Sequence, residues 1–408
     1  MTFATANRVA LRYVAEVTEN TTPTSPTLQA TRFTSESLNN SADFTSSEEI
    51  RSDRMTPDTV QTSLSAGGDI NGELSYQSYD DIIQGAMFST WVTSSGEVAE
   101  ATDITLTKTA GTPNTWVLTA SGATNFSTLL SDTAVGQFVE IVGFSVAGRF
   151  YAEVTSKSAT TLGIKPLTNV ATEAEGDPVS VIPLDYIRNG TTNRSFTIQK
   201  SFTDLSTVEY WNFTGAKIGE WSLDFQTGQI LNTAFSVLAR DGVMTESQFS
   251  GATVAAATTT GVMNAVNDVT AITFDGDPGG ATYRFNSLSL SMNNALRGQE
   301  AIGTLGFIGV VPGRLQITGD IELYFEDSSL FDNFRAATAF QLTLMVQDSD
   351  GNAYILTLPR CKYTSMEIVA GGLDTDIFAS ASLEALINSA GTYQIQLSRR
   401  PAANDAST

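Results

Sequence analysis

Few side chains in this 408-residue sequence could carry out catalysis. The chain contains no histidine, the commonest general base and transition-metal ligand. Its single cysteine, Cys361, therefore lacks the usual partner of a cysteine nucleophile, and we interpret it as a small core residue. Asp80 and Asp81 could pair as catalytic carboxylates, but at the start of an expected helix they are better explained as a cap and dipole partner. We expect no catalytic site and no cofactor, so the protein is not expected to be an enzyme.

One run of oxygen-bearing side chains resembles the start of a calcium loop. Asp348-Ser349-Asp350-Gly351-Asn352 alternates such residues, as ligands around one calcium ion do. The run lacks the glutamate that completes such a loop, and it separates two strand-like stretches. A hairpin turn, with Asp350-Gly351 at the positive-φ positions, therefore explains it better. The run Asp275-Gly276-Asp277-Pro278-Gly279-Gly280 receives the same interpretation, and we expect no metal site.

The composition excludes some classes of protein. Acidic residues number 44 against 22 basic ones, a formal charge of −22, whereas a surface that binds nucleic acid tightly needs clustered Lys and Arg. This charge suits instead a surface past which a polyanion moves without sticking. One cysteine excludes an intrachain disulfide. We find no signal peptide and no apolar run long enough to span a membrane, and expect a soluble protein made inside the cell, with no membrane partner.

A duplicated stretch sets the architecture of the chain, occurring once over residues 32–87 and again over 284–337. The copies open with Arg32-Phe33-Thr34-Ser35 and Arg284-Phe285-Asn286-Ser287. We align Gly72-Glu73-Leu74 with Gly319-Asp320-Ile321 further along. Each copy then reads as a long strand of alternating polarity, which predicts a sheet with one dry and one wet face. The wet face would carry Asp69 and Glu73 in the first copy, and Asp320 and Glu322 in the second.

These signals predict a mainly β protein. We expect two tandem β-sandwich or partial-barrel modules, each with one short helix, and a small all-β domain inserted into the first. The expected divisions are an N-terminal arm (1–30), module 1 (31–90 and 185–250), the inserted domain (91–184), a linker (251–282), module 2 (283–396) and a C-terminal tail (397–408).

The best anchors of a family resemblance are Gly72-Glu73-Leu74 with the helix at 80–87, Gly215-Ala216-Lys217-Ile218, and Gly319-Asp320-Ile321-Glu322-Leu323. The order of strand, charged loop, long amphipathic strand, short helix, hairpin and two closing strands resembles the tail tube (major tail) proteins of long-tailed, siphovirus-type bacteriophages. The resemblance covers residues of about 30–90 and 185–395. It implies a structural virion protein whose rings stack around a DNA channel, with long strands lining that channel. The inserted domain would decorate the tube exterior.

The resemblance also implies partners and a location. Copies of the chain would form rings, and a tape measure protein and tail terminator or distal tail proteins would bind the tube. Genomic DNA would pass through without tight binding, in a virion tail assembled in the host cytoplasm. Because tail tube rings commonly hold six modules, a two-module chain is expected to close as a trimer with pseudo-sixfold symmetry, in preference to a hexamer.

Particular residues receive roles in this hypothesis. Asp69, Glu73, Asp320 and Glu322 would give the channel a negative wall, although ordinary solubility charge explains them too. Irregular charged loops would join successive rings, through Glu48, Glu49, Arg51, Asp53 and Arg54 in one copy and Arg297 and Glu300 in the other.

The alternative is a β-sandwich module that binds carbohydrate or decorates a capsid or tail surface. An exposed aromatic cluster would favour that function, but the tryptophans are scattered along the chain, at Trp91, Trp116, Trp211 and Trp221.

Overall fold

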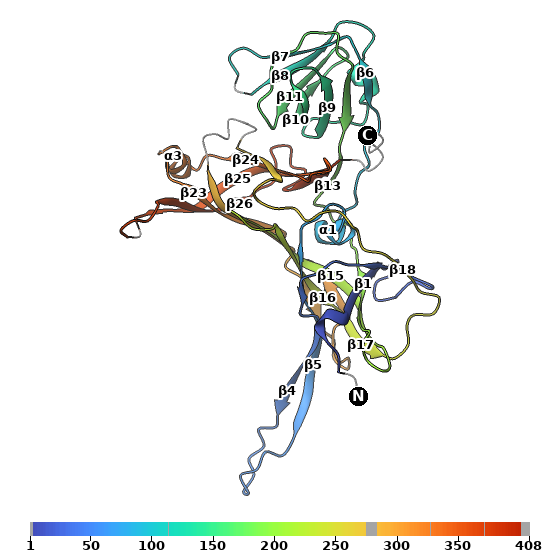
Figure 1. The fold of residues 1–408 in the computed structure, drawn as a ribbon. Helices are drawn as coiled ribbons and strands as arrows, with labels where there is room; N and C mark the ends of the chain where they lie inside the picture. The colour runs from blue at the N-terminus through green and yellow to red at the C-terminus, as the bar shows by residue number, and fades with distance from the viewer. Residues whose placement is uncertain (1–2, 113, 275–283, 327, 371, 401–408) are drawn as a thin grey trace.

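The structure, a computed structural model, describes residues 3–112, 114–274, 284–326, 328–370 and 372–400. It is mainly β with three short α-helices in the described residues, and its strands form two related modules and an inserted domain (Figure 1). The predicted fold class is therefore confirmed.

Each module is organised around one long strand whose two halves pair with different strands. In module 1 this strand is β15 (Glu209–Gln226), and in module 2 it is β25 (Ala353–Val369). The first halves pair with β14 (Phe196–Phe202) and β24 (Phe340–Gln347), respectively. The second halves pair with β16 (Asn232–Ala239) and β26 (Phe378–Ala385). Each long strand thus connects the two layers of its own sandwich.

The flanking strands also correspond between the modules. Beside β14 and β24 lie β1 (Val9–Ala15) and β19 (Val269–Phe274). Beside the first halves of the long strands lie β17 (Asp241–Thr245) and β27 (Gln396–Arg399). Beside β16 and β26 lie β5 (Thr59–Glu73) and β23 (Gln316–Tyr324). In module 1, β5 pairs in turn with β3 (Ser35–Glu36) and β4 (Asn39–Ser46). In module 2, β23 pairs in turn with β20 (Phe285–Asn293).

Matching bulges fix the residue-level correspondence of the modules. The pairing of β14 with β15 shifts after Phe196–Ala216, and that of β24 with β25 shifts after Phe340–Cys361. The buried Cys361 therefore occupies the place of Ala216, as the core-residue interpretation requires. A second shift, after Ile218 in β15, recurs after Tyr363 in β25.

The strand register corrects one sequence alignment. Ser236 of β16 pairs with Asp69, and the matching Ser382 of β26 pairs with Asp320. Asp69 therefore corresponds to Asp320, and the alignment of Gly72 with Gly319 is wrong by four positions. Both glycines lie in alternating strands, where periodicity alone cannot distinguish one register from another displaced by an even number of residues.

Three segments expected to lie outside the modules in fact contain module strands. The expected N-terminal arm contains β1, whose seven residues pair with β14. The expected linker contains β19, and the expected tail begins inside β27, which pairs with β25 and with β13 (Asp185–Arg188). Expecting a free arm or tail at these positions is therefore wrong, because short strands at chain ends gain their stability from partners far away in sequence.

Several shorter elements complete the modules. Near the N-terminus lie the 3-10 helix η1 (Ala6–Arg8) and β2 (Thr27–Ala30); β2 pairs with β1 and, in parallel, with β18 (Thr253–Ala255). A small hairpin of β21 (Arg297–Gln299) and β22 (Gly309–Val311) replaces in module 2 the long β4–β5 hairpin of module 1.

The two module helices differ in burial. They are α1 (Asp80–Met87) and α3 (Ser329–Arg335), and each is followed by a left-handed residue, Phe88 or Ala337. Six of the eight residues of α1 are buried, but Leu330 is the only buried residue of α3. The cap expected at the start of the first helix is wrong, because α1 has no side-chain hydrogen bond at its N-cap, and Asp80 points instead into a buried network.

The inserted domain forms its own seven-stranded sheet with a separate core. A third cluster packs its Phe138 and Tyr151 against Met345 and Ile355 of module 2, and Arg400 Nε lies 3.1 Å from Glu140 Oε2 across the same contact. The elements of this domain are β6 (Val98–Ala101), β7 (Ile104–Lys108), β8 (Trp116–Ala120), α2 (Phe126–Leu129), β9 (Phe138–Phe144), β10 (Gly148–Lys157), β11 (Thr161–Pro166) and β12 (Val179–Pro183).

Candidate functional site

The principal candidate site is the polar face of one continuous eight-stranded sheet that both modules build. Hydrogen-bonded pairing runs without interruption through β4, β5, β16, β15, β20, β23, β26 and β25. The alternation predicted from the sequence holds across the sheet. Trp221, Leu223, Leu288 and Ile321 lie buried on one face, so their polar neighbours lie on the other. We call that second face the polar wall.

The polar wall brings together all four acidic residues singled out from the sequence. Asp69 and Glu73 lie on β5, and Asp320 and Glu322 on β23, each exposed or half-buried. Sequence reasoning missed four more acids on the same face: Glu220 and Asp224 of β15, Glu384 of β26 and Glu367 of β25. The stretch Glu220-Trp221-Ser222-Leu223-Asp224-Phe225 alternates as clearly as the duplicated strands do, so a period-two signal for two of them was present.

The polar wall is concave where the two modules meet. A groove of about 610 Å³ follows this face, and its lining includes acids from three strands, namely Asp224, Asp320, Glu322 and Glu367. Small hydroxyl-bearing side chains from β20 and β26 fill the space between them, among them Ser287, Ser289, Ser380 and Ser382. In Figure 1 these strands curve together from the body toward the β23–β26 end of module 2.

Neutral donors, rather than cations, hold the carboxylates of the polar wall. Ser382 Oγ donates to Asp320 Oδ1 at 2.7 Å, Asn286 Nδ2 to Glu322 Oε2 at 2.5 Å, and Ser291 Oγ to Glu220 Oε1 at 2.6 Å. The same face carries two lysines, Lys362 of β25, which pairs with Glu384, and the buried Lys217 of β15. The exposed Arg314, at the edge of the wall, lies 3.8 Å from Glu384. Partial burial raises the pKa of Asp224 above its ordinary value.

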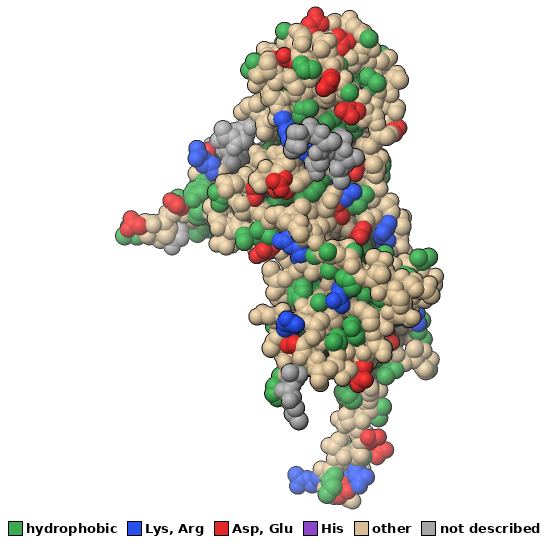
Figure 2. All heavy atoms as spheres, turned by 45° about the vertical axis from the view of Figure 1, so that its right-hand side comes forward, with side chains coloured by type: hydrophobic (Ala, Val, Ile, Leu, Met, Phe, Trp, Pro, Cys, Tyr) green, Lys and Arg blue, Asp and Glu red, His purple; other side chains and the backbone are tan. Residues whose placement is uncertain are grey.

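The charged loop of the first copy lies at the tip of the β4–β5 hairpin, which projects from the body of the molecule (Figure 1). Side chains of both signs gather at this tip (Figure 2). Arg51 Nη2 lies 2.6 Å from Asp53 Oδ2, and this bond holds the pKa of Asp53 below its ordinary value. Arg54 adopts φ 61°, and Glu48 and Glu49 are exposed. Fully exposed Ile50 and largely exposed Met55 add apolar surface to the same loop.

The corresponding loop of the second copy is folded back onto module 1. Arg297 belongs to β21 and Glu300 follows that hairpin strand. Lys217 Nζ donates to the carbonyl oxygen of Val310, and Arg240 Nε donates to that of Phe307 at 3.1 Å. The structure therefore does not bring the two sets of loop candidates together.

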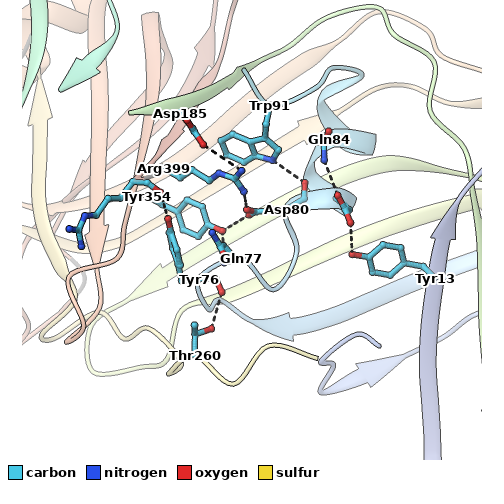
Figure 3. Close-up of polar contacts among 12 residues, drawn as sticks. Tyr13, Tyr76, Gln77, Asp80, Gln84, Trp91, Asp185, Thr260, Tyr354 and Arg399 are labelled. Atoms are coloured by element: carbon cyan, nitrogen blue, oxygen red, sulfur yellow. Dashed lines mark hydrogen bonds and ion pairs between the residues drawn. The ribbon is translucent and has the colours of Figure 1, made fainter. Parts of the chain in front are cut away.

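A buried polar network joins the modules beneath the polar wall, and sequence reasoning missed it (Figure 3). The carboxylate of Asp80, at the start of α1, binds Arg399 of β27 and accepts a hydrogen bond from Tyr354 of β25. Arg399 also lies 3.7 Å from Asp185 and stacks on the Trp91 ring at 4.3 Å. Burial raises the pKa of Asp80, although Arg399 opposes that shift. No local signal links residues more than 300 positions apart, so this contact could not be predicted from the sequence.

The calcium-like run forms a hairpin turn, as expected. The Asp348 carboxylate accepts the backbone N–H of Asp350 at 3.0 Å and that of Asn352 at 2.9 Å, so it stabilises the turn itself. Of the two expected positive-φ positions, only Gly351 has one, with φ 84°. The run 275–280 lies outside the described residues. Within the described ranges, no cluster of three metal-ligating side chains occurs, and no helix is long and apolar enough to cross a membrane.

Comparison with known proteins identifies the family. The model of the phage tail tube protein family matches residues 6–385, which include the inserted domain and every strand of the two modules except β27. A search of curated proteins finds no match. The match extends over nearly the whole chain and agrees with its duplicated β architecture. The chain belongs to the phage tail tube protein family, a family of structural components of the virion tail.

Proposed function

We propose that three copies of this chain close into a ring, that rings stack into a tail tube, and that the polar wall faces the channel through which genomic DNA passes. The observation that carries this proposal is the composition of the wall. Both modules contribute to one concave sheet face that bears the eight carboxylates named above against two lysines, the buried Lys217 and Lys362. A solubility surface needs no such concentration of one sign on a concave face.

The electrostatics favour passage of DNA over binding. Three chains carry −66 in total, because each carries −22. A wall rich in carboxylates repels phosphates along its length, and its few cations lie beside carboxylates, so DNA would find no strong site at which to stop. Serine, threonine and asparagine side chains cover much of the rest of the wall, so most of its surface is hydrated. Its exposed apolar side chains gather at one end of module 2, where Phe378 pairs with Tyr324 and with Val369.

The layering of the chain supports an outer position for the inserted domain. Met345 of β24 packs against this domain, whereas its neighbours Leu344 and Val346 face Trp221 and Leu223 of β15. Beyond β15 lies the polar wall. The inserted domain and the wall therefore occupy opposite sides of the molecule, which is the arrangement required if the wall faces the channel.

Stacking of rings is assigned in this proposal to the β4–β5 hairpin. It projects from the body and ends in exposed charges and exposed apolar side chains, Ile50 and Met55 among them. Deletion of residues 48–57 should leave a folded subunit that no longer elongates into tubes. Normal tubes from that variant would refute the assignment.

Electron microscopy and mass measurement of purified protein test the proposal as a whole. We expect tubes, and rings whose mass corresponds to three chains. Six chains per ring would refute the trimer. Isolated particles that bind a carbohydrate or capsid surface under conditions permitting tail assembly would refute the tube function.

Charge reversal tests the channel assignment separately. Asp69→Lys combined with Asp320→Lys places cations at corresponding positions of both modules, so phosphates would be held during passage. Tubes should still form, and DNA ejection from assembled particles should slow several-fold. Glu97→Lys with Glu100→Lys, in the inserted domain, is the matched control and should leave ejection unchanged. Equal ejection from both double variants would contradict an inward-facing wall.

A further inference from the structure

The chain contains a complete example of how one module binds the next. The outer edge of β15 in module 1 pairs with β20 of module 2 in an antiparallel register, with Leu223 opposite Leu290 and Ser222 opposite Ser291. Behind this edge, Trp221, Leu223 and Ile83 of module 1 pack against Leu344, Tyr354 and Leu356 of module 2. We call this combined contact the intrachain junction.

Module 2 presents the first half of this junction again, but uncovered. The second half of β25 corresponds to that of β15, and its outer edge pairs with no strand in the described part of the chain. Met366 and Ile368, at the positions of Trp221 and Leu223, are half-buried rather than buried. Phe325, which corresponds to the buried Leu74, is 41% exposed.

Module 1 presents the second half of the junction, also uncovered. Residues 35–41 correspond to 287–293 of β20, and they pair only with β5 among the described strands. Ser37 donates its backbone N–H to the backbone carbonyl oxygen of Asp69 in β5. Because successive N–H groups of a strand point to opposite edges, those of Leu38 and Asn40 point away from β5, toward the open edge. Both are bound by local side chains, Leu38 N to Glu36 Oε2 at 3.0 Å and Asn40 N to Asn39 Oδ1 at 2.8 Å.

The apolar surface behind that edge is likewise incomplete. The positions that match Val346, Leu356 and Leu397 of module 2 are Phe202, Trp211 and Met244 of module 1. The three residues of module 2 are buried in the intrachain junction. Phe202 and Trp211 are half-buried, and Met244 is 49% exposed. Lys200 lies over both aromatic rings, 5.4 Å and 5.5 Å from their centroids. An unprotected strand edge beside apolar surface is a template for pairing with another chain.

We propose that the open edge of β25 in one copy pairs with residues 35–41 of the next copy, in the register of the intrachain junction. Transferring that register places Ile368 opposite Leu38, Glu367 opposite Asn39 and Met366 opposite Asn40. The outward N–H groups of Leu38 and Asn40 then leave their local side-chain acceptors and donate to carbonyl groups of β25. Phe325, Met366 and Ile368 of one copy pack over Phe202, Trp211 and Met244 of the next.

The contact joins two different surfaces of the same chain, so it is heterologous and forms rings when its rotation closes. The inference rests on the proposed ring and names the interface that closes it. The polar wall would then continue from copy to copy without a break, because residues 35, 37, 39 and 41 occupy the positions of the wall residues of β20.

Disulfide trapping in a Cys361→Ala background tests the register. Glu367→Cys and Asn39→Cys would face each other in a non-hydrogen-bonded pair, where Cβ atoms approach closely enough for a disulfide. Oxidised tubes of the double variant should yield a covalent ladder that ends at three chains on denaturing gels. An equimolar mixture of the two single variants should yield only cross-linked dimers, and each single variant alone should yield none.

Matched pairs make the result decisive. Ser222→Cys with Ser291→Cys, at the intrachain junction, should cross-link within one chain and serves as the positive control. Glu367→Cys with Asn40→Cys tests a register displaced by one residue and should cross-link at least tenfold less. A stronger cross-link in that pair, or none at 367–39 while tubes form and the positive control oxidises, would overturn the proposed interface. The three-chain ladder in a sample that forms no tubes would support the interface and refute the tube function.

Discussion

The two modules share one architecture but differ in what covers it. In module 1, β20 covers the edge of β15, and six of the eight residues of α1 are buried. In module 2, the corresponding edge of β25 pairs with no strand among the described residues, and only Leu330 of α3 is buried. Trp221 and Leu223 are buried where Met366 and Ile368 are not. The difference teaches that a module is completed by a following module, which module 1 has within the chain and module 2 does not.

For the hairpins the difference is reversed, because here it is the element of module 2 that is covered and the element of module 1 that is exposed. The β21–β22 hairpin of module 2 lies against module 1, where Lys217 and Arg240 bind its carbonyl groups. The β4–β5 hairpin of module 1 is longer and projects from the body (Figure 1). Duplication therefore preserved the strands of the wall while allowing one copy of the hairpin to serve the intrachain junction and the other to reach outward.

The comparison predicts its largest effect for the aromatic core of the intrachain junction. Trp221→Ala should lower the free energy of unfolding of the unassembled subunit by about 3–5 kcal/mol, because a buried ring is lost and a cavity remains. Met366→Ala, at the corresponding position of module 2, should cost about 1 kcal/mol or less. Chemical denaturation of both variants measures the difference. Equal losses would mean that the two edges are equally covered in the free subunit.

The second-largest effect is expected for the buried ion pair between Asp80 of module 1 and Arg399 of module 2. Arg399→Leu leaves the Asp80 carboxylate buried without its cation and should cost about 3 kcal/mol at pH 7. Glu246→Gln, which alters the exposed position of module 1 that matches Arg399, should change stability by less than about 0.5 kcal/mol. Denaturation curves of the two variants, each compared with the parent, check the contrast.

The effect of Arg399→Leu should depend on pH. Burial raises the pKa of Asp80, so the folded state holds that proton more tightly than the unfolded chain does. The resulting stability is fully present below the unfolded pKa of about 3.9 and is lost as pH rises through the folded pKa. Removing Arg399 raises the folded pKa further. The destabilisation should therefore be larger at pH 7 than at pH 4, and a loss independent of pH would show that Asp80 is not its source.

The smallest predicted effect concerns the polar wall itself. Burial raises the pKa of Asp224, and the matching position in module 2 is Val369, which does not titrate. Asp224→Asn should stabilise the free subunit by about 0.5 kcal/mol or less at pH 7, and the gain should vanish below pH 4. Val369→Asn should show no such pH dependence. Destabilisation by Asp224→Asn at pH 7 would mean that the carboxylate makes a favourable contact on the wall.

Prediction from sequence was accurate where the signal is local. Alternation located β5 and β23 and the four acids on them, and the repeated Arg-Phe-x-Ser opening aligned β3 with β20 correctly. It was wrong for residues 9–15, expected to lie in an arm, because seven residues of strand carry no sign of a partner almost 190 positions away. The alignment of Gly72 with Gly319 was wrong for a related reason, since alternation has a period of two and leaves register undetermined.

The sequence by itself determined that this protein is an acidic, duplicated, mainly β chain with no histidine and a single cysteine. Those properties depend on composition and on periodicity within single strands, which the order of residues fixes directly. Only the tertiary structure decided that eight strands form one wall, that Glu220, Asp224, Glu367 and Glu384 join the four predicted acids, and that one end of each module is left open. These features depend on pairing between strands distant along the chain, and that pairing is selected by burial of the whole core rather than by any one stretch.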